Sequence, residues 1–302
     1  MPQQPARQTL SFLKRRFEEV GILPKVQHGQ NFLIDLNLIA VLVEAAELEP
    51  RDVVLEVGTG TGSLTAQVAP RCAAVVTVEI DPRMHQLASE ELIELSNVTM
   101  LQTDALKKKS QLSEELLEAV QKELDAAPNR RFKVVANLPY NVATPVLSNL
   151  LALERPPVVM AVTIQKELAD RITARPGTKD YSALSVWVQS QCTASILRVL
   201  PPEAFWPRPK VSSAFLHIVL EPERRAAIGN LAFFHQFVRA MFFHRRKYLR
   251  SELLSAFKNR LDKPAVDGIL AEQGIDPTVR AEQLPVETLL QLCDAVRRQT
   301  GD

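Results

Sequence analysis

Short apolar runs alternate with helical patterns between residues 50 and 165, and this alternation constrains the fold more than any other feature. The runs are Val53-Val54-Leu55, Val75-Val76-Thr77-Val78, Phe132-Lys133-Val134-Val135 and Val158 to Ile164. Short apolar runs separated by helical segments are typical of parallel strands joined by crossover helices. The sequence therefore predicts an α/β fold with a largely parallel sheet.

A glycine-rich turn follows the first of these runs. The chain has ten glycines, and three of them are Gly58, Gly60 and Gly62. Because glycine permits positive φ and lets backbone N–H groups approach a ligand, this turn predicts a nucleotide-like ligand. The dinucleotide fingerprint has Gly or Ala five positions after its first Gly, where this chain has Ser63. This departure weakens a nicotinamide interpretation without excluding it.

Two carboxylates follow later strands. Glu79 ends the second strand, where a carboxylate accepts hydrogen bonds from the ribose hydroxyls of an adenosine-containing cofactor. Asp104 follows the apparent strand from Val98 to Gln102, where its side chain could accept from an adenine amino group. Each also has a structural alternative, a surface carboxylate beside a tight turn for Glu79 and a helix N-cap for Asp104.

The tetrapeptide Asn137-Leu138-Pro139-Tyr140 follows the expected strand from Phe132 to Ala136 and faces the edge at which open α/β sheets bind ligands. An exocyclic aromatic amine is a poor nucleophile because its lone pair is delocalised into the ring. The Asn137 side-chain oxygen and the Leu138 carbonyl could accept its hydrogens and favour a pyramidal nitrogen. Pro139 stiffens the turn, and Tyr140 offers a flat face for a base. The alternative is a strand-ending proline turn with a buried tyrosine.

The composition indicates a core-forming protein. The chain is 46% hydrophobic and 24% charged, and its apolar runs are far shorter than the ~20 residues of a membrane-spanning helix. Its three cysteines lie far apart and its five histidines are scattered, so we expect neither a disulfide framework nor a metal site. Cysteine usage of this kind is typical of a reducing compartment, and we expect a cytoplasmic protein.

The charge is unevenly distributed. Residues 205–260 contain eleven Lys and Arg against three Asp and Glu, a difference of +8. Phe242, Phe243 and Tyr248 are interleaved with cations of this segment, which include Arg239, Arg245, Arg246, Lys247 and Arg250. Such a basic segment suits a polyanion such as nucleic acid, and the alternative is a solvated helix face.

The same patterns divide the chain into three parts. Residues 1–30 are expected to form a basic N-terminal arm, because Leu10, Leu13, Phe17 and Val20 lie at helical spacing among basic residues. This arm could contact nucleic acid or act as a targeting peptide. Residues 31–221 are expected to form the sheet domain. Residues 222–302 are expected to form a smaller helical domain, since helical periodicity continues after the linker.

Five segments in this order closely resemble the ribosomal small-subunit (16S) rRNA adenine N6-dimethyltransferases. They are His28-Gly29-Gln30-Asn31-Phe32-Leu33, Glu56 to Thr65, Val78-Glu79-Ile80-Asp81, Asn137 to Asn141 and Phe205 to Val211. The resemblance implies a Rossmann-like S-adenosylmethionine-dependent methyltransferase domain with a smaller, RNA-binding helical domain. It also implies dimethylation of two adjacent adenosines in the 3′-terminal hairpin of small-subunit rRNA during ribosome biogenesis.

The resemblance also implies roles for individual residues. The cofactor site would comprise Asn31, Leu33, Gly58, Gly60, Glu79, Asp104 and Asn137. Glu79 would hold the ribose and Asp104 the adenine. Tyr140 and Phe205 would stack on the two faces of the target adenine, and Asn137 with Leu138 would hold its amino group. The chain departs from the family at Thr103, where Gly is usual, and in the greater length of residues 107–131.

Three other functions stay open on the sequence. A related large-subunit rRNA adenine N6-methyltransferase that confers antibiotic resistance shares the Asn-x-Pro-Tyr chemistry. A non-catalytic RNA-binding assembly factor could retain the fold, although the intact Gly58, Glu79, Asn137 and Tyr140 argue against it. A nicotinamide oxidoreductase does not account for Asn137 to Tyr140. We expect a monomer that binds the immature small ribosomal subunit and no membrane.

Overall fold

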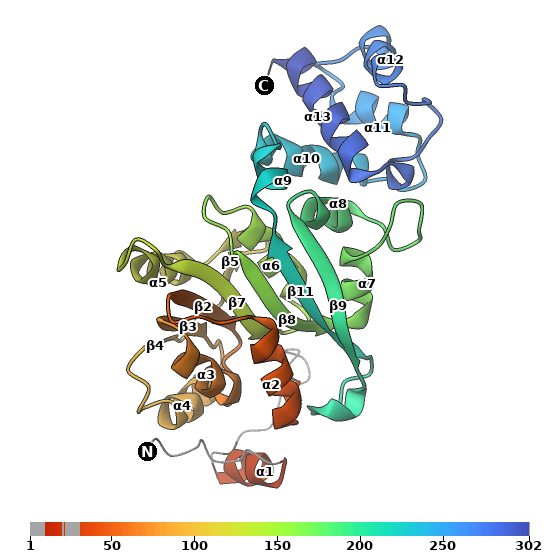
Figure 1. Cartoon of the computed structure of the whole chain (residues 1–302). Coiled ribbons are helices and arrows are strands. Elements are labelled where there is room, and N and C mark those ends of the chain that lie inside the picture. Colours follow the sequence, from red (N-terminus) through yellow and green to blue (C-terminus); the bar gives the residue numbers. More distant parts are fainter. Residues whose placement is uncertain (1–9, 20, 22–30, 302) are drawn as a thin grey trace. The chain divides into compact units, whose positions relative to one another are not determined.

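The computed structural model describes residues 10–19, 21 and 31–301 and contains a seven-stranded sheet (Figure 1). The strand order is β4-β3-β2-β7-β8-β11-β9. The strands are β2 (Asp52–Val57), β3 (Ala74–Val78), β4 (Val98–Leu101), β7 (Arg131–Asn137), β8 (Val159–Gln165), β9 (Cys192–Leu200) and β11 (Ser213–Leu220). Strands β4 to β8 in this order pair in parallel, and β11 pairs antiparallel with β8. The predicted α/β fold with a largely parallel sheet is confirmed.

Helices cover this sheet, as its parallel strands require. They are α2 (Leu36–Ala45), α3 (Ser63–Val68), α4 (Pro82–Glu91), α5 (Glu114–Asp125), α6 (Ala143–Leu151) and α7 (Lys166–Ile172). Buried side chains of α2 and α3 form a core cluster with Val54, Val75 and Val135 of the sheet. Helix α2 begins after Asp35, whose carboxylate caps it by accepting a hydrogen bond from the Asn37 N–H over 2.9 Å.

Two short ribbons lie beside the main sheet. One is the hairpin of β5 (Leu106–Lys108) and β6 (Gln111–Leu112). The other pairs β1 (Phe32–Leu33) with β10 (Phe205–Trp206) in antiparallel register. Phe32 lies opposite Trp206 and Leu33 lies opposite Phe205. Because directly paired side chains share a face, Phe32 and Trp206 lie on one face and Leu33 and Phe205 on the other.

Helix α1 (Leu10–Glu19) is the described part of the predicted N-terminal arm. Leu13 and Phe17 are buried, whereas Lys14 and Arg15 are exposed, so the predicted amphipathic helix is confirmed. The rest of the predicted arm, including the motif residues 28–30, lies outside the described residues.

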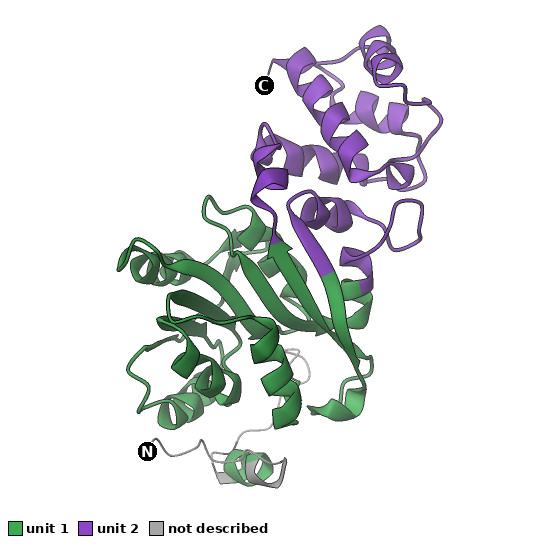
Figure 2. Ribbon diagram, in the orientation of Figure 1, with its two compact units in different colours: residues 1–169, 195–219 green, residues 170–194, 220–302 purple. Residues whose placement is uncertain are grey.

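The chain divides into two compact units, residues 1–169 with 195–219 and residues 170–194 with 220–302 (Figure 2). The helices of the second unit are α8 (Ala183–Gln189), α9 (Pro222–Ala226), α10 (Leu231–Met241), α11 (Leu249–Ala256), α12 (Lys263–Glu272) and α13 (Val286–Thr300). Short 3-10 helices occupy Ala69–Arg71, Pro202–Ala204 and Ala281–Gln283. None of the helices in the described ranges combines the length and the apolar character that crossing a bilayer demands.

The second unit resumes at residue 220, close to the predicted start at 222, but it also includes residues 170–194 of the predicted sheet domain. Trp187 stacks on His235 with ring centroids 4.2 Å apart, and Tyr181 donates a hydrogen bond to the Leu284 carbonyl over 3.1 Å. These contacts join a segment between two strands to residues that follow much later in the sequence.

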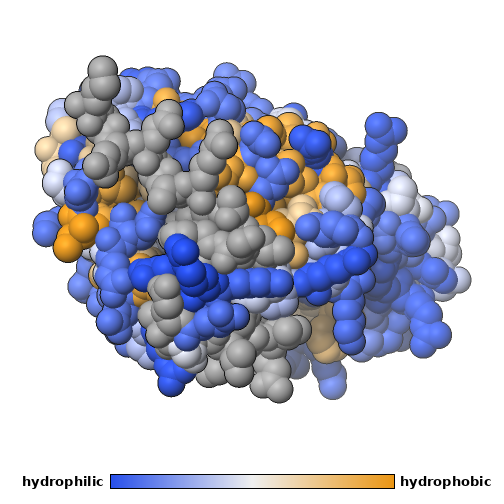
Figure 3. Space-filling view, turned by 90° about the horizontal axis from the view of Figure 1, so that it is seen from below, coloured by the Kyte–Doolittle hydropathy of each residue, from blue (hydrophilic) through white to orange (hydrophobic). Residues whose placement is uncertain are grey.

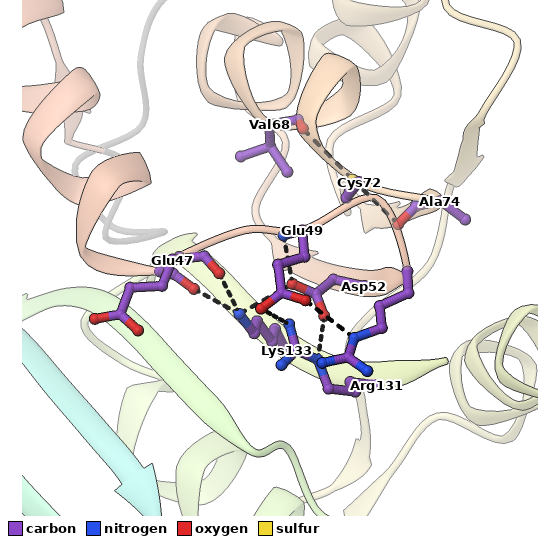
Figure 4. Close-up of polar contacts among 10 residues, drawn as sticks. Glu47, Glu49, Asp52, Val68, Cys72, Ala74, Arg131 and Lys133 are labelled. Carbon is purple, nitrogen blue, oxygen red and sulfur yellow. Dashed lines mark hydrogen bonds and ion pairs between the residues drawn. The ribbon is translucent and has the colours of Figure 1, made fainter. Parts of the chain in front are cut away.

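A buried ion cluster lies at the amino-terminal ends of β2 and β7 (Figure 4). Lys133 is 2% exposed, and its Nζ lies 2.9 Å from Asp52 Oδ2. The same Nζ donates to the carbonyls of Ala46 and Glu47, just beyond α2. Burial acts to raise the pKa of Asp52, but its hydrogen bonds, above all that from Arg131, hold the pKa below its usual value. The cluster ties α2 to the edge of the sheet opposite the candidate site.

Candidate active site

A pocket opens at the carboxyl ends of β2, β3 and β7, the edge at which open α/β sheets bind ligands. Its volume is about 830 Å³ with the open mouth included. The predicted residues that line it are Asn31, Gly58, Gly60, Glu79, Asp104, Asn137, Leu138, Pro139 and Tyr140. Leu33 lines a smaller neighbouring pocket, which also touches Gly58, Gly60 and Asn137.

The glycine-rich turn requires glycine at two positions. The φ angles of Gly58 and Gly60 are +86° and +58°, in the left-handed region that favours glycine. A Cβ on Gly58 would lie 3.3 Å from Pro139 Cγ, and one on Gly60 would lie 3.2 Å from Phe32 Cε1. Close packing against Pro139 and Phe32 therefore fixes the turn, whose backbone forms one wall of the pocket.

Glu79 is held by the backbone around it. Its Oε2 accepts from the Gly60 N–H and its Oε1 from the Asp81 N–H, each over 3.0 Å. The side chain is 6% exposed, and burial raises the pKa of this carboxyl. Because a carboxylate oxygen can accept two hydrogen bonds, each oxygen retains capacity for a ligand hydroxyl in the pocket.

Asp104 lies at the mouth of the same pocket. Its Oδ1 accepts from the Leu106 N–H over 2.9 Å. Leu106 begins strand β5, so Asp104 is not the N-cap of a helix, which was the structural alternative. Thr103 and Ile80 line the pocket beside it. Ile80 is 52% exposed, which gives the site an apolar surface next to two carboxylates. Sequence reasoning did not assign Ile80, although an apolar residue directly after Glu79 was a signal that could have found it.

The Asn137 side chain has a defined orientation. Its Nδ2 donates a hydrogen bond to the backbone carbonyl of Asn31 over 2.8 Å. The amide group is thereby turned so that Oδ1 is the atom left to accept from a ligand. The next residue is fixed as well, since the Leu138 N–H donates to the Thr163 carbonyl over 3.1 Å.

Tyr140 lines the pocket, and its hydroxyl forms a 2.5 Å hydrogen bond with the Ser213 hydroxyl. Burial raises the pKa of Tyr140, with the Ser213 hydrogen bond acting in the opposite direction. The ring is therefore held at its outer end by β11 and at its base by the turn after β7.

The structure does not bring Phe205 to the pocket, and the predicted pair of rings around the base must be corrected. The Phe205 side chain is 2% exposed and belongs to the core cluster beneath β1 and α2. The register of β10 against β1 explains this position, because Phe205 shares the inward face with Leu33. Phe32, on the other face, lines the pocket, and sequence reasoning did not assign it although it lies inside the first motif.

A buried carboxyl lies behind the glycine-rich turn. Glu56 accepts hydrogen bonds from the hydroxyls of Thr65 and Thr77, and Thr77 in turn bonds to Thr59 in the turn. Burial raises the pKa of Glu56 to about 8. This network connects β2 and β3 to the start of α3 and so supports the turn from below.

The five predicted RNA-binding cations differ in their environment. Arg245 is paired with Glu282 over 2.8 Å, and Arg250 makes two hydrogen bonds to the Asp267 carboxylate. Lys247 lies 4.0 Å from Glu252. Arg239 and Arg246 are exposed, with no acidic partner among the described residues. These two are the cations most accessible to a phosphate.

Other reactive groups give no second site. Within residues 10–19, 21 and 31–301, no three His, Cys, Asp or Glu side chains are grouped so that they could hold a metal ion. The thiols of Cys72, Cys192 and Cys293 are buried, and burial raises the pKa of each to about 12.

Comparison with known proteins places these features in context. A family model described as ribosomal RNA adenine dimethylase matches residues 23–297. The ribosomal RNA small subunit methyltransferase A of Streptococcus pneumoniae strain JJA is 38% identical over 290 residues, which are 96% of this chain and 97% of the relative.

Two solved structures share the fold. A dimethyladenosine transferase from Plasmodium falciparum has a TM-score of 0.71 at 22% identity, over 88% of this chain and 97% of that chain. The 23S rRNA methyltransferase ErmE has a TM-score of 0.61 at 26% identity, over 88% of this chain and 99% of that chain. The Rossmann-like methyltransferase fold is confirmed.

Proposed function

Since the chain belongs to the ribosomal RNA adenine dimethylase family, we propose that it dimethylates N6 of two adjacent adenosines in the 3′-terminal hairpin of small-subunit rRNA. The methyl donor is S-adenosylmethionine, and the substrate is the immature small ribosomal subunit. The name of the Streptococcus pneumoniae relative supports the choice of the small subunit.

The pocket residues fit this cofactor. Glu79 keeps acceptor capacity on both oxygens for the two ribose hydroxyls, and the turn at Gly58 and Gly60 leaves room for a ligand against the backbone. Asp104 and Ile80 flank the part of the pocket suited to the adenine. When bound, S-adenosylmethionine supplies a methyl group that its sulfonium sulfur has already activated.

The observation that carries the proposal is the orientation of the Asn137 amide. Because Nδ2 is committed to the Asn31 carbonyl, Oδ1 can accept a hydrogen from the target amine. The Leu138 carbonyl would accept the other, since Leu138 lines the same pocket. Tyr140 offers its ring to an unstacked adenine, and stacking of this kind contributes about 1–3 kcal/mol per base. These residues align the amine for in-line transfer and exclude water from it.

We propose that Arg239 and Arg246 contact RNA phosphates, which set the position of the hairpin without reading its sequence. The protein acts as a monomer in the cytoplasm, where small subunits are assembled.

Methyl transfer to isolated ribosomal particles tests the proposal. The purified protein, incubated with labelled S-adenosylmethionine, should add two methyl groups to each of two adjacent adenosines in immature small subunits, as counted by mass spectrometry of the rRNA. Transfer to large-subunit rRNA alone would establish the antibiotic-resistance activity instead. Tight binding to small subunits without any transfer would establish a non-catalytic assembly factor.

A further inference from the structure

Phe32 connects the cofactor pocket to a cluster of aromatic side chains that the proposed chemistry does not use. The ring lines the main pocket and the smaller pocket beside it. Its Cε1 and Cδ1 lie closer than any other side chain to the position that a Cβ on Gly60 would occupy. Gly60 in turn donates its N–H to Glu79, so a displaced Phe32 ring would disturb the turn that orients this carboxylate.

The ring of Phe32 is held from outside by helix α1. Phe17 of α1 meets it edge to face, with ring centroids 5.4 Å apart, and lies 5.3 Å from the ring centroid of Trp206. Phe17 is 2% exposed and packs against Met84 and Leu87 of α4. Phe17 is therefore an internal residue of this cluster and not a surface side chain.

Polar contacts fix α1 in the same place. Arg16 forms an ion pair with Glu90 of α4 over 2.9 Å, and Arg83 of α4 donates to the Gly21 carbonyl over 2.9 Å. Helix α4 itself starts directly after Glu79 and Asp81. Helix α1 thus contacts Phe32, which packs on the glycine-rich turn, and α4, which follows Glu79 in the sequence.

Helix α1 lies at the lower end of the view in Figure 1, and Figure 3 looks at the molecule from that side. Hydrophobic residues gather there among hydrophilic ones. Phe17 is withdrawn from this face, which leaves Lys14 and Arg15 exposed on the helix.

We infer that α1 is part of the cofactor-binding machinery and that Phe17 is a positioning residue, which acts through Phe32 on the glycine-rich turn. The inference rests on the proposed function, because it assumes S-adenosylmethionine as the ligand. Docking of α1 and binding of the cofactor are then thermodynamically linked, so each strengthens the other by the same factor. The effect falls on cofactor affinity and not on the transfer step.

Calorimetry with S-adenosylmethionine on the full-length chain tests this inference. Phe17→Ala should raise the dissociation constant about 2- to 10-fold, the range expected for loss of one aromatic pair. It should raise KM for the cofactor while kcat at saturating cofactor stays unchanged. Phe17→Leu, which keeps most of the apolar volume, should restore most of the affinity.

A matched control separates positioning from general stability. Leu116→Ala removes a fully buried side chain of α5 in the same unit, away from the pocket. It should lower the melting temperature at least as much as Phe17→Ala does and leave the dissociation constant unchanged. Equal dissociation constants for Phe17→Ala and the wild type would overturn the inference. An equal rise in the dissociation constant of Phe17→Ala and Leu116→Ala would overturn it too.

Hydrogen exchange gives a second readout of the same linkage. Amides of residues 10–19 should exchange more slowly when S-adenosylmethionine is added to the wild type, and this protection should disappear in Phe17→Ala. Unchanged exchange in the wild type on saturation with the cofactor would refute the coupling. If the wild type did not bind S-adenosylmethionine at all, the proposed function would fail first, and the two failures are thus distinguishable.

Discussion

The side-chain amide of Asn137 donates a hydrogen bond to the backbone carbonyl of Asn31 across 2.8 Å, although the two residues are 106 positions apart. This bond joins the end of β7 to the residue before β1. It also decides which atom of the amide is available to a ligand, because Nδ2 is already committed. The target amine is therefore offered an acceptor without any rearrangement of Asn137.

Asn137→Asp tests the importance of this orientation. The substitution keeps the size of the side chain but places a carboxylate oxygen, instead of a donor, against the Asn31 carbonyl. Loss of one preorganised polar contact in an active site lowers kcat by about 100- to 1,000-fold in well-studied cases, and we expect a loss of this order. Single-turnover methyl transfer to immature small subunits measures it. A variant with wild-type turnover would show that the bond to Asn31 has no part in the reaction.

Tyr140 allows stacking to be separated from hydrogen bonding. Tyr140→Phe removes only the bond to Ser213 and should keep most of the activity, because the ring remains. Tyr140→Ala removes the stacking face and should reduce methyl transfer by about 5- to 150-fold, equivalent to 1–3 kcal/mol. Calorimetry with S-adenosylmethionine should show a much smaller change for both variants. Equal activity of the Phe and Ala variants would eliminate the stacking role.

The sequence predicted those parts of the site that depend on local pattern. Strand ends, the glycine-rich turn and the positions of Glu79 and Asn137 follow from short-range periodicity and from the rule that ligands bind at strand carboxyl ends. The register of β1 against β10 is a long-range property, and it alone decides that Phe32 faces the pocket and Phe205 the core. A slip of one residue would exchange the two faces, and no local pattern excludes it.

Contacts between residues distant in sequence also explain which features outside the pocket the sequence did not predict. A run of cations predicts a basic surface, but the sequence does not show that Arg245 and Arg250 face Glu282 and Asp267. Residues 170–194 lie between two strands in the sequence, and only the folded chain shows that Trp187 stacks on His235. In both cases the partner is distant in sequence, and periodicity carries no information about it.

Glu79→Ala should weaken the binding of S-adenosylmethionine by about 10- to 100-fold, since hydrogen bonds to charged groups contribute about 1.5–3 kcal/mol. Burial raises the pKa of Glu79, so its carboxyl takes up a proton at a higher pH than an ordinary Glu does. The protonated form has less acceptor capacity. Affinity of the wild type should therefore fall as pH is lowered through this raised pKa, and calorimetry across pH measures it. Glu79→Gln should lack this fall, and an identical pH profile in that variant would assign the titration to another group.

Glu56 predicts a dependence of stability on pH. Its folded pKa of about 8 lies above the ordinary value of 4.5, so the folded state retains a proton that the unfolded state has released. The free energy of unfolding should fall as pH rises from 4.5 to 8 and level off above that. Glu56→Gln has no carboxyl to titrate and should not lose stability in this way. With ~1.4 kcal/mol per pKa unit, its free energy of unfolding at pH 8 should exceed that of the wild type by up to a few kcal/mol. The gain at pH 5 should be small.

Urea unfolding at pH 5 and pH 8 measures the effect of Glu56→Gln. Substitution of the exposed Glu115 by Gln is the control, and it should change stability equally little at both values. A gain that is the same at both pH values would mean that Glu56 is ionised in the folded protein throughout this range.

Arg246 and Arg250 give a matched pair for RNA binding. Arg246 is exposed without an acidic partner among the described residues, whereas both ends of the Arg250 guanidinium hydrogen-bond to Asp267. Arg246→Ala should weaken binding of small-subunit RNA and reduce the slope of log affinity against log salt by about 1, as loss of one phosphate contact does. Arg250→Ala should leave this slope nearly unchanged and have little effect on stability, because it breaks a surface ion pair. Filter binding between low and physiological salt measures both slopes, and a larger change for Arg250→Ala would mean that RNA displaces Asp267.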